Sequence, residues 1–209
     1  LGALATIIYY TFTSEIFPLS GLIVVFAGLA VGTLIGAYLA KTVKMTGMPE
    51  MVSLLNGFGG ACSLLLSTLE YMDYADVIGT DSGPSAFIKI STALGIFVGG
   101  VTFTGSVVAW GKLSGKLKDL RLPAQQLINM ALLFTAIVLG GIMVTSDSAN
   151  YVVFTILIVL SLIYGYFFVM PIGGADMPVV IALLNSFSGI AGVFAGFLIA
   201  NNAMIIAGI

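Results

Sequence analysis

Residues 150–170 read NYVVFTILIVLSLIYGYFFVM, a stretch without a single charged side chain. An α-helix needs roughly 20 apolar residues to cross a bilayer core of about 30 Å, and this stretch has that length. The same bias holds for all 209 residues, of which 59% are apolar and only 8% are charged. A soluble domain carries about 25% charged residues. The composition therefore excludes a soluble domain and predicts a membrane protein.

Polar breaks divide the rest of the chain into segments of similar length. Complete membrane spans are expected at about 19–40, 50–69, 86–110, 124–145, 150–170 and 178–200. Partial spans are expected at the two ends, at about 1–12 and 203–209. We therefore expect an all-α polytopic membrane protein, a helix bundle that forms one transmembrane domain over 1–209. Because Leu1 is not an initiator Met and both ends fall within a span, we interpret the chain as a fragment of a longer polypeptide.

Charge and residue usage exclude several other classes of protein. Seven Lys and Arg against nine Asp and Glu give a net charge of −2, which offers no basic surface for nucleic acid. The single cysteine, Cys62, excludes a disulfide framework and a cysteine-based metal site, and we expect it to be a small packing residue. The chain has no histidine, which excludes His-dependent zinc sites and Ser-His triads within it. No catalytic or metal site is expected in this chain.

The charged residues separate into two sets of alternate loops. One set holds six of the seven cations: Lys41, Lys44, Lys112, Lys116, Lys118 and Arg121. The other set holds Lys89 and most of the acids: Glu15, Glu70, Asp73, Asp76, Asp81 and Asp147. Loops rich in Lys and Arg face the cytoplasm, or the matrix in a mitochondrion, so we place the first set there. An aromatic belt is expected near the opposite boundary, formed by Tyr9, Tyr10, Tyr71 and Tyr74.

One segment of the chain recurs. Residues 48–60 read MPEMVSLLNGFGG and residues 177–189 read MPVVIALLNSFSG, so Met, Pro, Leu-Leu-Asn, Phe and the last Gly match at a constant offset of 129. The second copy comes four spans after the first, so both helices run outward from the same side and the repeat is parallel rather than inverted. Proline falls in the first helical turn of each copy, where its missing N–H costs nothing.

The helix of each copy carries small and polar residues at spacings of three and four, which keeps them on one helix face. The first copy has Ser53, Asn56, Gly60, Ser63 and Ser67, and the second has Ala182, Asn185, Gly189, Gly192 and Gly196. The span 86–110 has its own set, Gly95, Gly99, Thr102, Ser106 and Ala109. At 1.5 Å per residue, Asn56 and Asn185 lie about 10 Å into the bilayer and Ser106 about 6 Å. All three are expected in the inner third of the membrane.

Two interpretations of these polar residues stay open. Small-residue faces are normally packing surfaces, and a membrane Asn or Ser often joins helices with about 0.6–2 kcal/mol. Polar groups in hydrocarbon are costly, however, and they also mark pathways. Glu50 and Asp176 are the acids at the two helix entrances, where a carboxylate favours the positive end of the helix dipole.

Several motifs together resemble one protein family. They are MTGMPE at 45–50 with Asn56, VTFTGSVVA at 101–109, GKL at 111–113, and IGGADMP at 172–178 with LNS at 184–186. In this order and spacing, over essentially the whole chain, they resemble the membrane domain of the β subunit of proton-translocating nicotinamide nucleotide transhydrogenase.

The resemblance implies a three-part enzyme. In that family an NAD(H)-binding domain and an NADP(H)-binding domain exchange a hydride outside the membrane, and the membrane domain couples this transfer to proton movement. The implied partners are the α subunit and the NADP(H)-binding domain of the β subunit, in a dimer of αβ units. The implied location is the bacterial cytoplasmic membrane, or the mitochondrial inner membrane in a eukaryote. Since the chain has no strand-flanked Gly-rich nucleotide fingerprint, NAD(H) and NADP(H) are expected to bind outside it, and it alone lacks the hydride-transfer sites.

The resemblance also implies roles for individual residues. Asn56, Ser106 and Asn185 match positions along the proton path that is proposed for the family. Asp176 matches an acid at the membrane surface that faces the NADP(H) domain, and Glu50 matches an acid at the equivalent entrance. Family members carry His or Asn at the position of Asn56, and where it is Asn, a His on another helix, often in the α subunit, takes the role of proton carrier. Because Asn does not titrate, we assign Asn56, Ser106 and Asn185 to hydrogen-bonding and water-organising roles.

Two other functions remain open from the sequence. A secondary transporter with a site between the parallel-repeat helices would take up its substrate without other subunits. A structural membrane subunit of a larger complex would tolerate small apolar residues in place of Asn56 and Asn185.

Overall fold

The computed structural model describes residues 19–80, 83–120 and 122–209. Over these ranges it consists of helices joined by short turns, without a strand. Five helical segments are long and apolar enough to cross a membrane, namely Met45–Val77, Ala86–Leu113, Gln125–Thr145, Tyr151–Val169 and Met177–Leu198. The expected all-α membrane fold is therefore confirmed. The expected partial span at 1–12, with Tyr9, Tyr10 and Glu15, lies outside the described residues, as do Asp81 and Arg121.

The chain divides into two compact units, Leu1–Met45 and Thr46–Ile209. The described part of the first unit is dominated by helix α2 (Leu19–Thr42), which is 24 residues long. Its bounds lie close to those of the span expected at 19–40. The section Phe26–Thr42 of this helix is apolar. That α2 crosses the membrane, and that 1–209 forms one domain, stay predictions.

The second unit contains the other helices. They are α3 (Met48–Tyr74), α4 (Ala86–Leu113), α5 (Gln125–Thr145), α6 (Tyr151–Val169), α7 (Met177–Leu198) and α8 (Asn202–Gly208). Their ends agree with the expected spans to within about two turns. The largest difference is at the end of α3, which continues to Tyr74, so Glu70 lies in a helix and not in a loop as expected.

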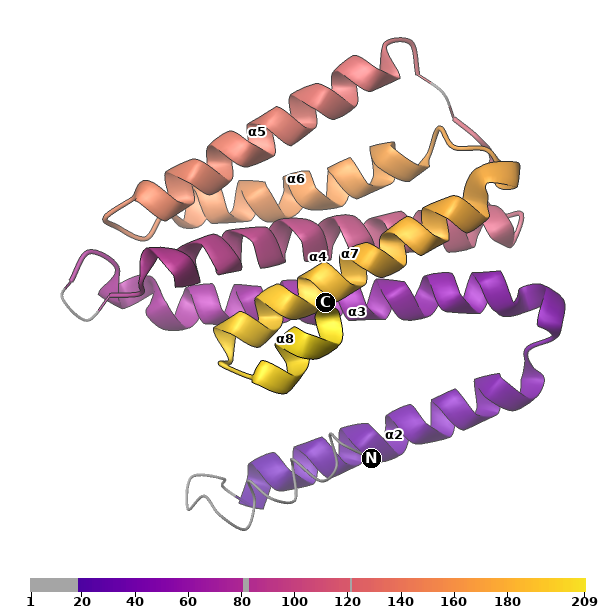
Figure 1. The fold of residues 1–209 in the computed structure, drawn as a ribbon, viewed down its shortest axis with the longest axis horizontal. Coiled ribbons are helices and arrows are strands. Elements are labelled where there is room, and N and C mark those ends of the chain that lie inside the picture. The colour runs from indigo at the N-terminus through magenta and orange to yellow at the C-terminus, as the bar shows by residue number, and fades with distance from the viewer. Residues whose placement is uncertain (1–18, 81–82, 121) are drawn as a thin grey trace. The chain divides into compact units, whose positions relative to one another are not determined.

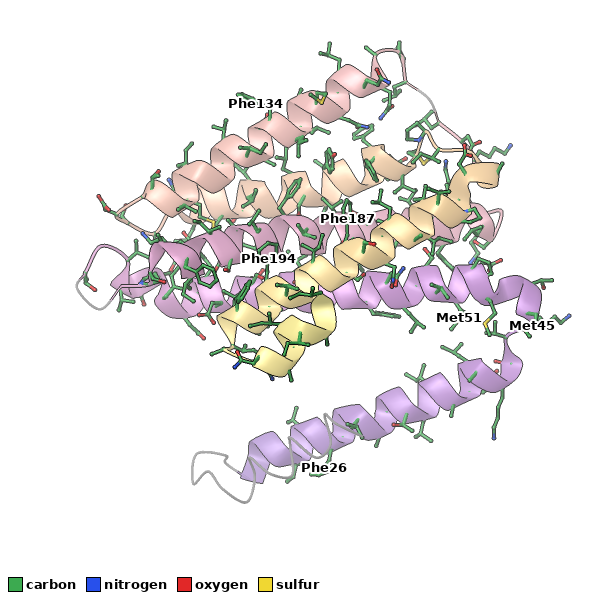
Figure 2. All side chains as sticks on the ribbon, viewed as in Figure 1. Phe26, Met45, Met51, Phe134, Phe187 and Phe194 are labelled. Carbon is green, nitrogen blue, oxygen red and sulfur yellow. The ribbon has the colours of Figure 1, made fainter. Side chains whose placement is uncertain are left out.

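Helix α4 is central to this second unit. It packs against α3, α5, α6 and α7, and Figure 1 shows it between α3 and α6. Many of its buried residues are small, among them Gly95, Gly99, Gly100 and Gly105, which lets several helix backbones approach one helix closely. Helix α7 packs against both α3 and α4, and α8 folds back along α7. The outer face of α5 is uncovered: Phe134 points away from the unit and is 68% exposed (Figure 2).

The last turn of α3 is held by an aromatic core. The Tyr71 ring stacks on Phe154 of α6 with 4.3 Å between centroids, and its hydroxyl accepts a hydrogen bond of 3.0 Å from the Asn150 N–H. Tyr71 is 1% exposed and Tyr74 is 7% exposed. The expectation that these tyrosines form an aromatic belt is therefore wrong. Their rings are core residues, because packing against α6 buries them and the Tyr71 hydroxyl finds a polar partner there.

Two sets of contacts define the two ends of this unit. At one end, the Lys89 Nζ donates to the Ser146 carbonyl at 3.0 Å, beside the Tyr71–Asn150 contact. At the other end, the Lys112 Nζ donates to the Ile172 carbonyl at 2.7 Å. The loops following α3 and α5 therefore share one end, and those following α4 and α6 share the other. This grouping agrees with the expected alternation of loops, and which end faces the cytoplasm stays a prediction.

The structure confirms the parallel repeat. A short 3-10 turn, Met45–Gly47, precedes α3, and its counterpart Gly174–Asp176 precedes α7 at the same offset of 129. Each helix begins at the Met of its copy and carries Pro in the first turn. The residue numbers of contacting pairs increase together in the two helices, from Asn56 with Ile181 to Ser63 with Ala191. Helices α3 and α7 therefore run in the same direction.

Candidate functional site

The buried polar side chains are concentrated between two helices. Within the described ranges these residues are Ser53, Asn56, Ser63, Ser67, Ser91, Thr92, Thr102, Ser106 and Ser161. All except Ser161 belong to α3 or α4. The small-residue faces expected for these two helices are both buried, and they meet each other. The α3–α4 interface is therefore the polar interior of the second unit.

Ser106 lies against α3 at Ser53 and Gly57, which flank Asn56 along the chain. The Ser53 Oγ donates to the Ser106 carbonyl at 2.8 Å, and a Cβ on Gly57 would lie 3.2 Å from the Ser106 Cβ. Ser106 is fully buried, and its own Oγ makes no hydrogen bond to the described part of the protein. We call Ser53, Asn56 and Ser106 the Asn56 cluster. Its hydroxyl at Ser106 is a polar atom with unused hydrogen-bonding capacity.

Asn56 also connects α3 to α7. Its Nδ2 donates to the Ile181 carbonyl over 3.4 Å, which is long for a hydrogen bond. The Ser188 Oγ of α7 donates to the Asn56 carbonyl at 3.1 Å and to the Leu184 carbonyl at 3.1 Å. The Asn56 side chain is 7% exposed. Asn56 therefore lies where α3, α4 and α7 meet.

The structure leaves Asn185 apart from the Asn56 cluster. Asn185 is exposed and lines a cavity of about 730 Å³ between α7 and α8, together with Ser186, Ser188 and Gly208. Helix α7 instead turns Ile181, Leu184, Ala191 and Ala195 into the unit. Each of these positions comes one residue before a member of the expected small-residue face. A step of one residue rotates the exposed face of a helix by about 100°. Ser188 is the connection between the two places, because it bonds to Asn56 and lines the Asn185 cavity.

Glu50 and Asp176 lie at the end of the unit where α3 and α7 begin. Glu50 is half-buried in the first turn of α3. Asp176 is exposed and occupies the residue before α7, but its side chain makes no capping hydrogen bond. A hydrogen-bonded cap is thus not the role of the Asp176 carboxylate, which is presented at the surface of this end.

Lys112 is a residue whose importance the sequence analysis missed. The sequence places Lys112 in a loop, yet it lies in the last turn of α4 and its side chain is only 3% exposed. Its Nζ donates to the Met170 and Ile172 carbonyls and to the Asp119 Oδ1, the last at 2.8 Å. Lys112 therefore ties the loop after α4 to the turn between α6 and α7, a few residues before Asp176. The GKL motif includes this position, but no pattern in the neighbouring sequence predicts that the Lys112 side chain is buried.

The described residues offer little to a metal ion or a nicotinamide dinucleotide. Among them there is no group of three or more His, Cys, Asp or Glu that could hold a metal. The Asn185 cavity and an apolar cavity of about 310 Å³ between α4, α5 and α6 are both lined without Lys or Arg. Neither lining therefore offers the cations that often bind dinucleotide phosphates. Cys62, expected in the packing, is exposed, since it falls beside the buried face of α3.

Comparisons with known proteins agree on one family. The family model described as NAD(P) transhydrogenase beta subunit matches residues 1–209. The chain belongs to this family. Two curated relatives from Rhodospirillum rubrum, both named NAD(P) transhydrogenase subunit beta, are 36% identical over 183 residues. The match covers 86% of this chain and 39% of each relative, so the chain spans about two fifths of the length of these relatives.

Family and fold agree with each other. The resemblance to the membrane domain of the transhydrogenase β subunit is thus confirmed. With several helices able to cross a bilayer, this member of the family is a multi-pass membrane protein.

Proposed function

We propose that this chain is the proton-translocating membrane domain of an NAD(P) transhydrogenase. It couples proton passage across the membrane to hydride transfer between NADH and NADP⁺. The hydride is exchanged by nucleotide-binding domains outside this chain, and NAD(H) and NADP(H) bind there. Membership of the family supports this function.

The observation that carries the proposal is the Ser106 hydroxyl. It is fully buried against Ser53 and Gly57, which flank Asn56 along α3, and makes no hydrogen bond among the described residues. Leaving a buried hydroxyl unpaired costs about 1–3 kcal/mol, which a bound water would offset. Ser and Asn both donate and accept hydrogen bonds, so they can order water without a fixed charge. Such water can pass a proton, whereas Asn56 itself does not titrate.

Asn185 joins the path through Ser188. The cavity beside Asn185 is polar on the Asn185–Ser188 side, and Ser188 bonds to the Asn56 carbonyl. We place Asn185 at the approach to the Asn56 cluster and Ser106 at its buried end. Asn56 does not titrate, so following the resemblance we assign proton binding to a His on another helix, as in family members that carry Asn at this position.

Coupling to the nucleotide-binding domains takes place at the end where α3 and α7 begin. Asp176 is exposed there and Glu50 is half-buried. Lys112 donates a hydrogen bond to the Ile172 carbonyl and so holds the turn that precedes Asp176. We assign this face to the NADP(H)-binding domain of the β subunit and place it in the cytoplasm or the mitochondrial matrix. The complete enzyme is a dimer of αβ units in a bacterial cytoplasmic or mitochondrial inner membrane.

The test uses the complete enzyme in sealed vesicles and measures protons moved per hydride transferred. Ser106→Ala removes the hydroxyl with little steric change, and Asn56→Leu and Asn185→Leu remove the amides. Each variant loses about one hydrogen bond to a water of the path, which should lower the number of protons moved per hydride about tenfold. Ser161→Ala is the matched control, because Ser161 is equally buried but donates to the Ile158 carbonyl at 2.7 Å.

Three outcomes separate the proposed function from the others. A lowered proton yield in the three variants with a normal yield in Ser161→Ala supports the path. Full pumping by all three correctly assembled variants would mean that these residues only join helices. Substrate uptake by this chain without other subunits would favour a secondary transporter instead.

A further inference from the structure

Two more buried hydroxyls on α3 make no hydrogen bond within the described part of the chain. They belong to Ser67, which is fully buried, and Tyr74, which is 7% exposed. Ser67 lies three helical turns after Asn56 on the same face, about 16 Å further along the helix. The unpaired hydroxyls of α3 and α4 thus fall into two groups, one near each end of the interface.

Both hydroxyls face α4. A Cβ on Gly95 would overlap the Ser67 Oγ, so the glycine makes room for this hydroxyl. The Tyr74 hydroxyl lies beside Thr92, one turn before Gly95, without a hydrogen bond of normal geometry. The Thr92 Oγ1 itself donates to the Ile88 carbonyl at 2.9 Å. We call Ser67, Tyr74 and Thr92 the Ser67 cluster.

A tight helix contact separates the Ser67 cluster from the Asn56 cluster. A Cβ on Gly60 would lie 2.7 Å from the Phe103 N and 2.8 Å from the Gly99 carbonyl oxygen. Two backbones this close leave no space for a water molecule. The hydroxyls near this contact are already paired, since Ser63 donates to the Ala191 carbonyl at 2.9 Å and Thr102 to the Val98 carbonyl at 2.6 Å.

A comparison with Ser161 shows that the unpaired state of Ser67 is not a general property of buried serines here. Ser161 of α6 is also fully buried and also faces a glycine of α4, Gly100. Its hydroxyl donates to a carbonyl of its own helix, at Ile158. Ser67 also faces a glycine of α4, Gly95, but makes no such bond. The Ser67 hydroxyl is therefore available to a ligand that both donates and accepts, and water is the smallest such ligand.

We propose that the Ser67 cluster is a second water-binding site of the proton path, nearer the end where α3 finishes. The contact between Gly60 and Gly99 closes the path between this site and the Asn56 cluster, so a proton passes when α3 and α4 separate there. This inference rests on the proposed function for its role in proton passage. The presence of water at Ser67 can be tested without it.

The first measurement is water access. Ser67→Cys and the matched Ser161→Cys are made in a Cys62→Ala background of the complete enzyme, because Cys62 is exposed. A small, membrane-impermeant thiol reagent is then added from the side of the 75–85 loop. Ser67→Cys should react at least tenfold faster than Ser161→Cys. Equal, slow reaction of both would overturn the inference, since the site would then be dry.

The second measurement is proton yield per hydride in vesicles. Ser67→Ala and Tyr74→Phe each remove one hydroxyl, and each should lower the yield several-fold, while Ser161→Ala leaves it unchanged. A hydrated Ser67 site with normal yield in both variants would overturn its place on the path. If Ser67→Cys stays unlabelled while Ser106→Ala still lowers the yield, this inference fails and the proposed function stands. If the unmodified enzyme moves no protons, the proposed function fails, and the labelling still reports whether the site is hydrated.

Discussion

A Cβ on Gly60 of α3 would lie 2.8 Å from the carbonyl oxygen of Gly99 on α4, and one on Gly99 would lie 2.9 Å from the carbonyl oxygen of Gly60. Each glycine thus makes room for the backbone of the other helix. Without a hydrophobic driving force between helices in lipid, this kind of close backbone packing is a main source of helix association. This contact between the two helices lies between the Asn56 cluster and the Ser67 cluster along the α3–α4 interface.

Replacing Gly60 by Ala should push α3 and α4 apart. Neighbouring backbone atoms cannot yield as a flexible side chain does, so we expect a loss of about 1–3 kcal/mol in the free energy of unfolding. The measurement is thermal unfolding of the purified protein in detergent. Gly141→Ala on α5 is the control, because nothing lies within 4 Å of a Cβ there. It should leave stability unchanged or raise it by up to about 1 kcal/mol through helix propensity. Equal stability of both variants would contradict the tight contact.

Replacing Lys112 by Met should loosen the turn between α6 and α7. The ammonium group is the shared donor to the Met170 and Ile172 carbonyls and to Asp119, so its loss removes three hydrogen bonds. We expect destabilisation of about 1.5–3 kcal/mol and faster proteolysis between residues 170 and 176. Lys118→Met changes an exposed cation of the loop that follows α4 and should stay within about 0.5 kcal/mol of the unmodified protein. The same small effect for both lysines would show that the buried position of Lys112 does not matter.

Labelling of single cysteines should place the two ends of the second unit on opposite sides of the membrane. Lys118 and Asp76 are both exposed. Asp76 lies in the connection that precedes α4, and Lys118 lies in the loop that follows it. In a Cys62→Ala background, we expect Lys118→Cys to react from the cytoplasmic or matrix side and Asp76→Cys from the other, following the bias in Lys and Arg. Reaction of both from one side would be incompatible with this topology, and reaction with the sides exchanged would reverse the orientation.

Replacing Asp176 by Asn should change the enzyme's response to NADP(H) while leaving its fold intact. The carboxylate is exposed and makes no capping hydrogen bond to α7, so the change should cost little stability. We expect altered NADP(H) affinity or a lower proton-coupled rate in the complete enzyme, measured by nucleotide titration and by vesicle assay. Asp73→Asn, an exposed acid near the opposite end, serves as the control. Normal affinity and a normal rate in Asp176→Asn would remove this residue from the coupling interface.

The candidate site was only partly predictable from the sequence. Spacings of three and four correctly indicated that Asn56 and Ser106 lie on buried, closely packed faces. The same reasoning did not separate hydroxyls that are satisfied by their own helix, such as Ser161, from those that are not, such as Ser67. That difference depends on the rotamer and on the neighbouring helix, and neither is encoded in a periodic pattern. The buried state of Lys112 was missed for a similar reason, because its acceptors come from a turn 58 residues later in the chain.

The sequence by itself determined the class of protein, the positions of most spans and the parallel repeat. These features depend on neighbours along the chain: the length of an apolar run, a proline in the first turn, and charges in the loops. Only the tertiary structure decided which face of each helix is covered. Helix α3 buries Asn56 together with the rest of its small-residue face and meets α4 at Ser53 and Gly60, whereas α7 enters the unit through positions one residue before its own small-residue face, at Leu184 and Ala191. A rotation of about 100° separates those two faces, so two asparagines with the same local sequence are buried at position 56 and exposed at position 185.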